Sequence, residues 1–393
     1  MSALIGSQRA ANHVLAVVLS ILTPALAVSG AQAQTASSAL SAHVPEVTQQ
    51  AVDGYWTADR LKSAKPMDLA PKVGANGLPI VNDAGPVSGP SVKSKGAAPS
   101  VELGPLSMKT LIAPQAQDLQ LQNLASPGPE PEATSSYGAD FTTARVSPDS
   151  TTVSYPYRAA GKLYFSDPRT GGNFVCSASV LRPRIIVTAG HCVTKPSTTA
   201  ANRYFYSNFL FVPAYNNGAA PYYTWTPSVE WISNAWYFSD GSVPNAQDVG
   251  MLVANDRTIG NARYKLGNIT GWYGYWTNQL GNNNVTMLGY PCNLDNCQKE
   301  EMNNAQTFAY GGNNTYTYGS AMRGGSSGGP WVQDFGIAPV SNPAVALGGN
   351  YIVGVTSYGP IATDPKYQGA SNLDSRFLSL LSAACGPATS GNC

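Results

Sequence analysis

The sequence predicts an all-β domain with one terminal helix in the last 240 residues of the chain, and three observations carry this prediction. Of 38 aromatic residues, only Tyr55, Trp56, Tyr137 and Phe141 precede residue 154, which leaves 34 in the C-terminal part. Short runs of β-branched and aromatic residues recur there, each bounded by Gly, Asn, Pro or Asp. Many short strands over such a length suit closed or paired barrels.

The beginning of the chain predicts export. Arg9 precedes an apolar run at residues 14–22, and Ala31-Gln32-Ala33 resembles a cleavage site, so residues 1–33 are expected to be a signal peptide. A membrane anchor is the alternative, but the run is short and Pro24 interrupts it. We expect a secreted protein with no membrane segment after signal removal. Six cysteines in an oxidising compartment indicate three disulfides rather than a metal site.

The segment that follows, residues 34–145, is rich in Ala, Pro, Ser and Gln. It has too few apolar side chains to offset its chain entropy, so we expect a largely extended or disordered propeptide. A linker is the alternative. One helix-like patch spans residues 108–124.

Strands are predicted most clearly at residues 174–181, 185–187, 249–253, 285–290 and 351–355. The only longer helical pattern is at residues 372–381, where Leu373, Phe377 and Leu380 fall on one face. The overall charge of +1 excludes a polyanion-binding surface, so no nucleic-acid partner is expected.

Three segments of this domain carry residues suited to chemistry. His191 follows a predicted strand within Thr188-Ala189-Gly190-His191-Cys192, and the other two histidines, His13 and His43, precede the domain. Asp248 opens an apolar strand, which alone is a weak signal because Asp is a common turn residue. The third segment is Gly324-Gly325-Ser326-Ser327-Gly328-Gly329-Pro330. It could be a flexible turn, but glycines also let a backbone approach a carbonyl and direct N–H groups at an oxyanion.

Together, the order His191, Asp248, Ser327 and the two motifs resemble the chymotrypsin-like serine endopeptidases, in the bacterial and fungal branch that includes the glutamyl endopeptidases. The resemblance covers residues 154–385. It implies two six-stranded antiparallel β-barrels with a C-terminal helix. His191 and Asp248 would lie on the first barrel, Ser327 on the second, and the site between them.

The resemblance also implies roles. Ser327 would be the nucleophile, His191 the base and Asp248 the residue that orients the imidazole. The N–H groups of Gly325 and Ser327 would form the oxyanion hole, and residues 357–359 would pair with an extended substrate. The expected activity is hydrolysis of peptide bonds through an acyl-enzyme, with polypeptide substrates, no cofactor, no metal and a monomeric enzyme.

Three positions depart from the family pattern. Ser326 stands where trypsin-like zymogens carry an aspartate, so the usual activation ion pair cannot form. Ala321 stands where trypsins place an acid, so cleavage after Lys or Arg is not expected. Thr356 stands where glutamyl endopeptidases place a histidine, which puts strict glutamate specificity in question.

The sequence allows two interpretations of the specificity pocket. Its expected residues are Ala321, Met322, Arg323, Thr356, Ser357, Tyr358 and Gly359. With Ala321 and Met322 pointing inward it would be apolar, the interpretation that we favour slightly. With Arg323 inward it would bind an acidic side chain.

Disulfides and processing complete the predictions. The family has a bridge at positions matching Cys176 and Cys192, and Cys292 with Cys297 and Cys385 with Cys393 would close short local loops. By the family's usual spacing, the mature domain spans residues 146–393 after cleavage of Arg145-Val146. Without the activation ion pair, cleavage would act by unblocking the site or releasing a folding aid.

The alternative function is a catalytically inactive binding module for protein or carbohydrate. The residues that could stack on sugars are Trp225, Trp231, Trp236 and the run Gly271-Trp272-Tyr273-Gly274-Tyr275-Trp276, although barrel packing and loop anchoring are the ordinary roles of such side chains.

Overall fold

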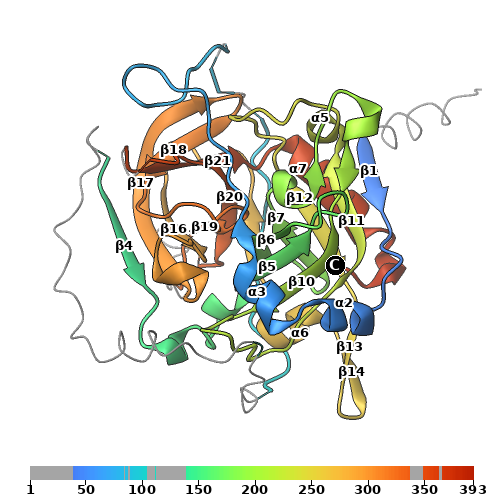
Figure 1. The fold of residues 1–393 in the computed structure, drawn as a ribbon. Helices are drawn as coiled ribbons and strands as arrows, with labels where there is room; N and C mark the ends of the chain where they lie inside the picture. The colour runs from blue at the N-terminus through green and yellow to red at the C-terminus, as the bar shows by residue number, and fades with distance from the viewer. Residues whose placement is uncertain are drawn as a thin grey trace, which may run out of the picture. The chain divides into compact units, whose positions relative to one another are not determined.

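The computed structural model of the protein describes residues 39–83, 85–86, 89–103, 111, 139–336, 348–362 and 365–393. The expected signal peptide and nearly all of the helix-like patch at residues 108–124 lie outside these ranges. Most strands of the described part belong to two large sheets, drawn in green and in orange to red in Figure 1.

The second sheet closes into a six-stranded barrel. Its antiparallel ladders run in the order β19, β16, β17, β18, β21 and β20, and β20 pairs again with β19. The strands are β16 (Asn284–Gly289), β17 (Glu301–Gly312), β18 (Thr315–Gly319), β19 (Pro330–Gln333), β20 (Tyr351–Tyr358) and β21 (Tyr367–Asn372). Two register shifts in the long β17 bend the sheet, as closure of a small barrel requires.

The first sheet has six domain strands but stays open. They follow the order β11, β12, β7, β6, β5 and β10. Their bounds are β5 (Ala160–Ser166), β6 (Asn173–Val180), β7 (Ile185–Thr188), β10 (Ser207–Pro213), β11 (Pro227–Ser233) and β12 (Gly250–Ala254). β10 reaches the other end of this sheet through one isolated bridge, between Phe211 and Trp225, and Trp225 lies just before β11.

The prediction of two closed six-stranded barrels is therefore right for the second sheet and wrong for the first, which is a half-barrel. The physical reason is an added strand. The free edge of β11 pairs along four residues with β1 (Leu40–His43), so its backbone groups are not available to β10.

The terminal helix α7 (Ser375–Cys385) begins three residues later than the pattern predicts. Asp374 caps it by accepting a hydrogen bond from the Arg376 N–H, while Leu373 is buried ahead of the helix. The buried face has the i, i+3, i+4, i+7 spacing and consists of Phe377, Leu380, Leu381 and Ala384. Among the described residues, no helix is long and apolar enough to cross a membrane.

Shorter elements lie between the strands of the two sheets along the chain. They are β8 (Thr194–Lys195), β9 (Tyr204–Phe205), α5 (Asn234–Tyr237), β13 (Arg257–Ile259), β14 (Ala262–Tyr264), α6 (Leu266–Thr270) and β15 (Gly274–Trp276). A shared hydrophobic core joins the two sheets, with Ile185 and Val187 from the first and Leu288 and Val355 from the second.

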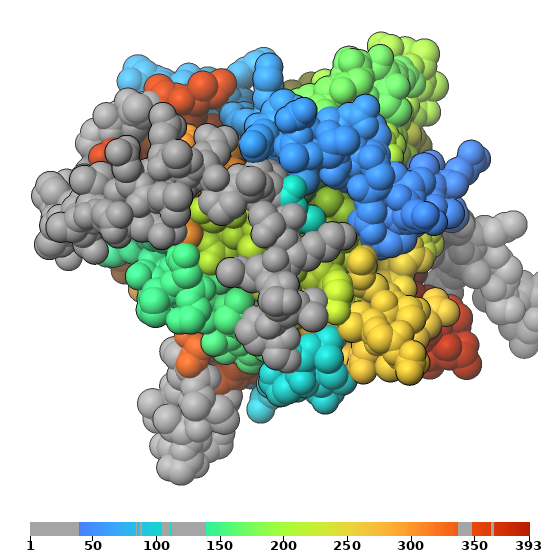
Figure 2. Space-filling view, turned by 60° about the horizontal axis from the view of Figure 1, so that its bottom comes forward, coloured from blue at the N-terminus to red at the C-terminus, as the bar shows by residue number. Residues whose placement is uncertain are grey.

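The described part of residues 39–145 contains ordered elements, where a largely extended or disordered segment was expected. They are β1, α2 (Gln49–Tyr55), α3 (Ala58–Ser63), β2 (Lys65–Pro66), β3 (Lys93–Ser94) and β4 (Phe141–Arg145). Val52, Trp56 and Leu61 are buried against Tyr164 and Leu210 of the first sheet. The few apolar side chains of this segment thus use the core of the following domain. In Figure 2 its first residues, in blue, lie against the yellow segment near β13 and β14.

All six cysteines are paired as expected: Cys176 with Cys192, Cys292 with Cys297 and Cys385 with Cys393. The first bridge ties β6 to the short 3-10 turn Gly190–Cys192 that follows β7.

Replacing both Cys176 and Cys192 with alanine is expected to lower the free energy of unfolding by roughly 3 kcal/mol, because the bridge closes a loop of 16 residues. Urea denaturation followed by tryptophan fluorescence measures this loss. The matched control is the double variant Cys385→Ala, Cys393→Ala, whose shorter loop should cost somewhat less. An unchanged urea midpoint for the first variant, or peptide mapping that links Cys192 to Cys292, would contradict the assignment.

Candidate active site

His191 and Asp248 are held together by the antiparallel pairing of β7 with β12. The strand pair sets Gly250 opposite Thr188, so the turn after β7 lies beside the residue that precedes β12. The two carboxylate oxygens of Asp248 accept hydrogen bonds from the His191 backbone N–H at 2.7 Å and from Nδ1 at 2.8 Å. This pair of bonds fixes the imidazole and leaves Nε2 as the nitrogen directed away from the acid.

A third bond to Asp248 comes from the second sheet. Ser357, on β20, donates its hydroxyl to Oδ2 of Asp248 at 2.6 Å. Asp248 is 0% exposed, and a buried carboxylate is costly unless donors satisfy it. Strands of both sheets therefore meet at one carboxyl group.

Ser327 lies in the loop between β18 and β19 and is fixed to the first sheet through its backbone. Its carbonyl accepts a hydrogen bond from the Ser177 N–H at 2.8 Å. The Ser177 hydroxyl donates to the Gly325 carbonyl at 2.9 Å and accepts from the Tyr290 N–H at 2.9 Å. Ser177, which the sequence analysis did not single out, thus holds the loop of Ser327 against β6.

The peptide groups before Gly325 and Ser327 have their carbonyls turned inward. The Gly324 carbonyl accepts from the Cys292 N–H at 2.7 Å, and the Ser326 carbonyl accepts from the Gly329 N–H at 2.9 Å. Because N–H and C=O point in opposite directions across a trans peptide, the N–H groups of Gly325 and Ser327 point away from these partners. Gly325 has φ 95°, and a Cβ there would lie 2.5 Å from the Tyr290 carbonyl oxygen. Only glycine fits this conformation.

Ser326 holds the loop without an acidic residue. Its hydroxyl donates to the Arg323 carbonyl at 2.6 Å and accepts from Nε2 of Gln368 at 2.5 Å. Gln368 is itself fixed by the Ser320 hydroxyl at 3.0 Å. Gln368 is a buried polar residue on β21 that no local sequence pattern distinguishes. Position 326 is therefore held by neutral hydrogen bonds, whereas an aspartate at this position would require a charged partner.

A segment of the N-terminal region crosses this site, which the sequence analysis did not foresee in detail. We call residues 65–69 the crossing segment; it follows α3 and runs in blue between the two sheets in Figure 1. Lys65 and Pro66 pair in parallel with β6, and the Met67 N–H donates to the Val175 carbonyl at 3.3 Å. At its other end, the Leu69 carbonyl accepts from the Gly359 N–H at 3.2 Å.

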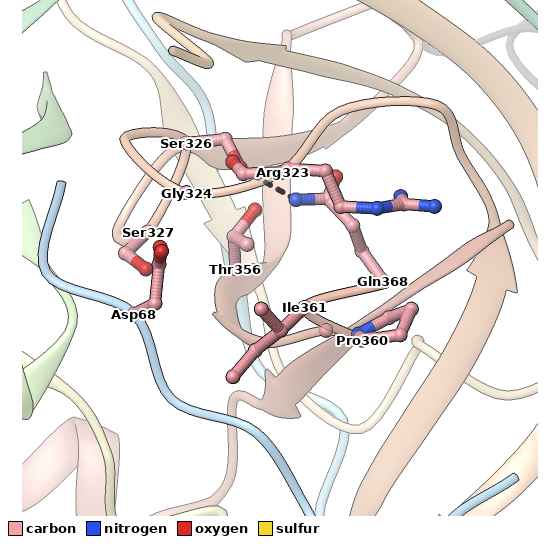
Figure 3. Close-up of a pocket in the computed structure, with 10 residues that line it drawn as sticks. Asp68, Arg323, Gly324, Ser326, Ser327, Thr356, Pro360, Ile361 and Gln368 are labelled. Carbon is pink, nitrogen blue, oxygen red and sulfur yellow. Dashed lines mark hydrogen bonds between the residues drawn. The ribbon is translucent and has the colours of Figure 1, made fainter. Parts of the chain in front are cut away.

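The crossing segment contains the acceptor of the hydrogen bond that the Ser327 hydroxyl donates. The Ser327 hydroxyl donates to the Met67 carbonyl at 3.2 Å, while Nε2 of His191 is buried with no hydrogen-bond partner among the described residues. Figure 3 shows Asp68 beside Ser327, with its carboxyl group extending toward the loop at Gly324. Burial raises the pKa of Asp68, and the charge of His191 opposes this shift.

The pocket next to Ser327 is lined by some, but not all, of the residues expected to form the specificity pocket. Besides Asp68 and Ser327, its lining consists of Arg323, Gly324, Ser326, Thr356, Gly359, Pro360, Ile361 and Gln368 (Figure 3). Of the seven predicted residues, Arg323, Thr356 and Gly359 line it. Met322 is instead buried in the core of the closed barrel with Trp331, and Ala321 packs against the same core. Neither residue lines this pocket, so the apolar interpretation stays a prediction without support from its described lining.

The other two predicted wall residues lie beneath the pocket, where Ser357 binds Asp248 and Tyr358 shares a hydrogen bond with Thr315. The Arg323 guanidinium bonds to the carbonyls of Ser320 and Met322 through Nη1 and to that of Pro365 through Nη2. Thr356 Oγ1 accepts from Trp331 Nε1 at 2.8 Å. Its hydroxyl hydrogen is therefore available to another acceptor.

The tryptophans considered for sugar stacking are mostly internal. Trp225 and Trp236 are 1% and 0% exposed, and Trp231 packs against the core that the two sheets share. Trp225 and Trp236 are therefore not accessible to a sugar, whereas Trp272 and Trp276 of the other candidate run are half-buried.

One group of metal-ligating residue types occurs at the site. Ligand atoms of Cys176, His191 and Cys192 lie within 4.8 Å of one another. The two sulfurs are joined in a disulfide, which removes the thiolates that a metal would need, and Nδ1 of His191 is bonded to Asp248. These three residues therefore do not fit a metal ion.

No protein-family model matches the chain. Among curated proteins, the "Extracellular metalloprotease" of Bacillus subtilis (strain 168) is 29% identical over 146 residues, which cover 36% of this chain and 42% of that protein. The chain thus spans less than half the length of this relative.

Solved structures similar to the chain are proteases. The protease Anisep from Arthrobacter nicotinovorans is 26% identical with a TM-score of 0.47 and covers 58% of this chain and 95% of its own. The thermostable serine protease AL20 from an extremophilic microorganism is 22% identical with a TM-score of 0.47, covering 61% and 100%. A Glu endopeptidase is 17% identical with a TM-score of 0.45, covering 62% and 95%. The chain is similar to an extracellular protease in sequence and to serine proteases among solved structures.

Proposed function

We propose that the protein is a secreted serine endopeptidase that hydrolyses polypeptides through Ser327, His191 and Asp248. The observation that carries this proposal is the buried Asp248 carboxylate bonded to both the backbone and Nδ1 of His191, with Ser327 fixed nearby by its backbone. Secretion is supported by the similarity to an extracellular protease and by the three disulfides. We also propose that the mature enzyme is a monomer.

The proposed mechanism follows from the roles of these groups. Ser327 Oγ attacks the carbonyl carbon of the substrate while His191 Nε2 takes the hydroxyl proton. Asp248 holds the imidazole in the required tautomer and stabilises the imidazolium. The N–H groups of Gly325 and Ser327 stabilise the oxyanion. His191 then gives the proton to the leaving amine, and water hydrolyses the acyl-enzyme by the same steps.

We further propose that residues 34–145 form an inhibitory propeptide. Support comes from the crossing segment, whose Asp68 lines the pocket and whose Met67 carbonyl accepts the hydrogen bond of the Ser327 hydroxyl. That carbonyl directs its oxygen at Oγ, whereas acyl transfer requires the oxygen to face the N–H donors and the carbon to face Oγ. The crossing segment is therefore bound as an inhibitor and not as a substrate.

The pocket favours an acidic substrate side chain. In this chain Asp68 lines it with its carboxyl group, and Arg323 is the one cationic residue among its described lining residues. Thr356 can donate its hydroxyl to a carboxylate there. We therefore propose cleavage after Glu or Asp, and a basic side chain would enter without a charge partner.

Triad substitutions test the catalytic proposal. Ser327→Ala or His191→Ala in the processed enzyme should each lower kcat by about a millionfold, and Asp248→Asn by about ten-thousandfold, because these groups act as a unit. Ser326→Ala is the matched control at the neighbouring serine: it removes two neutral hydrogen bonds that hold the loop and should lower kcat far less than Ser327→Ala. Steady-state hydrolysis of a peptide library measures these effects. Undiminished activity in Ser327→Ala would refute the proposal.

The inhibitory role is tested with a synthetic peptide of residues 63–71. It should inhibit the processed enzyme competitively and stay intact, whereas a peptide of the same composition in scrambled order should do neither. Initial rates and mass spectrometry of the peptide give both readouts. Full-length protein that hydrolyses substrate as fast as the processed form would show that the crossing segment does not inhibit.

Specificity is tested by sequencing the products of a denatured protein mixture, which should end mostly in Glu or Asp. Thr356→Val should lower kcat/KM for a Glu substrate about 10- to 100-fold, because a hydrogen bond to a charged group contributes about 1.5–3 kcal/mol. A Leu substrate should not show this loss, and Thr356→Ser, which keeps the hydroxyl, is the control. Products that end mostly in Leu or Phe, or in Lys or Arg, would contradict the proposed pocket.

A further inference from the structure

Glu300 is a buried carboxyl group that the proposed mechanism does not use. It is 1% exposed, and neither side-chain oxygen has a hydrogen-bond partner among the described residues. Burial raises the pKa values of Tyr273 and Tyr290, and the charge of Glu300 adds to both shifts. Both tyrosine hydroxyls bond elsewhere, to the carbonyls of Pro156 and Tyr215. Burial holds the pKa of Glu300 well above its usual range.

The proposed processing bond lies beside this residue. The N–H of Val146 donates to the Glu300 carbonyl at 2.9 Å, and Val146 is 3% exposed within the shared core. Tyr273 belongs to the same core cluster as Val146. The nitrogen that cleavage of Arg145-Val146 would release is therefore already at the backbone of Glu300.

The surrounding charges include more acids than bases. Arg145 forms a two-point ion pair with Asp295 and lies opposite Glu301 in the pairing of β4 with β17. Burial raises the pKa of Glu301 to about 9. Lys299 pairs with Asp149 at 2.7 Å. The residues named here that lie around the Arg145-Val146 bond thus include four carboxyl groups and two cations.

Cleavage would change the number of positive charges near these carboxyl groups. Hydrolysis breaks the C–N bond and adds the hydroxyl of water to the Arg145 carbonyl and a hydrogen to the Val146 nitrogen, which then binds a proton. Arg145 would leave with the propeptide, so the acids would lose one cation as a new ammonium forms beside them. An ammonium carries three donors, enough to keep the bond to the Glu300 carbonyl and add others.

We propose that the Glu300 carboxylate is a binding site for the α-ammonium group of Val146 in the mature enzyme. This proposal rests on the proposed cleavage of Arg145-Val146. The unpartnered oxygens of Glu300 would gain donors, and the new N-terminus would be anchored in the core between the two sheets. Because Ser326 is already held by Gln368 and the Arg323 carbonyl, the ammonium would fix the N-terminus and not shape the loop of Ser327.

The experiment measures the reactivity of the amine and does not depend on activity. In the Ser327→Ala protein, residues 142–145 are replaced by the recognition sequence of an added protease, which cuts before Val146. The cut protein is treated with acetic anhydride at pH 8, and mass spectrometry follows acetylation of the Val146 amine. A free peptide beginning with the same residues gives the reference rate.

The Val146 amine should react at least tenfold more slowly than the reference, because it is buried and held protonated. Glu300→Gln should raise its rate at least tenfold, while the neighbouring control Glu301→Gln should change it less than threefold. A wild-type rate equal to the reference would overturn the proposal even if Glu300→Gln fails to fold. Equal effects of the two substitutions would overturn the assignment to Glu300. N-terminal sequencing of naturally processed enzyme tests the cleavage site separately.

Discussion

The arrangement of the site depends on one buried carboxylate. Asp248 accepts two hydrogen bonds from His191 in the first sheet and one from Ser357 in the second. A buried charge of this kind is stable only where enough donors converge on it. The two sheets therefore satisfy this group together, and the same contacts fix the orientation of the histidine.

The loop of Ser327 is anchored by neutral contacts on both sides. Ser177 binds it to β6, and Ser326 binds it to the Arg323 carbonyl and Gln368. No ion pair is needed to keep the N–H groups of Gly325 and Ser327 outward. We interpret the uncleaved chain as a formed site that its own residues 65–69 occupy. Release of that segment would free Ser327 to bond with Nε2 of His191.

Much of the fold was predictable from strand patterns and glycine motifs, because burial on both faces of a strand leaves a readable apolar run. The open edge of the first sheet was not predictable, since it depends on the pairing of β1 with β11, and the four residues of β1 carry no strand signal of their own. The N-terminal elements were missed for the same reason: their few apolar side chains are buried only against Tyr164 and Leu210.

Within the site, the motifs around His191 and Ser327 were distinctive, whereas Asp248 became informative only in their company. The direction of Met322 and the role of Gln368 depend on tertiary packing that local sequence does not encode. Asp68 follows Met67 in a segment without a distinctive motif, so its place beside the pocket required the structure.

Covalent labelling of the processed protein with a phosphonylating serine reagent tests the central claim most directly. Intact mass should increase by one adduct per chain, and peptide mapping should place it on Ser327. The full-length protein should react far more slowly, and His191→Ala hardly at all. An unmodified processed protein, or an adduct on another residue, would contradict the account.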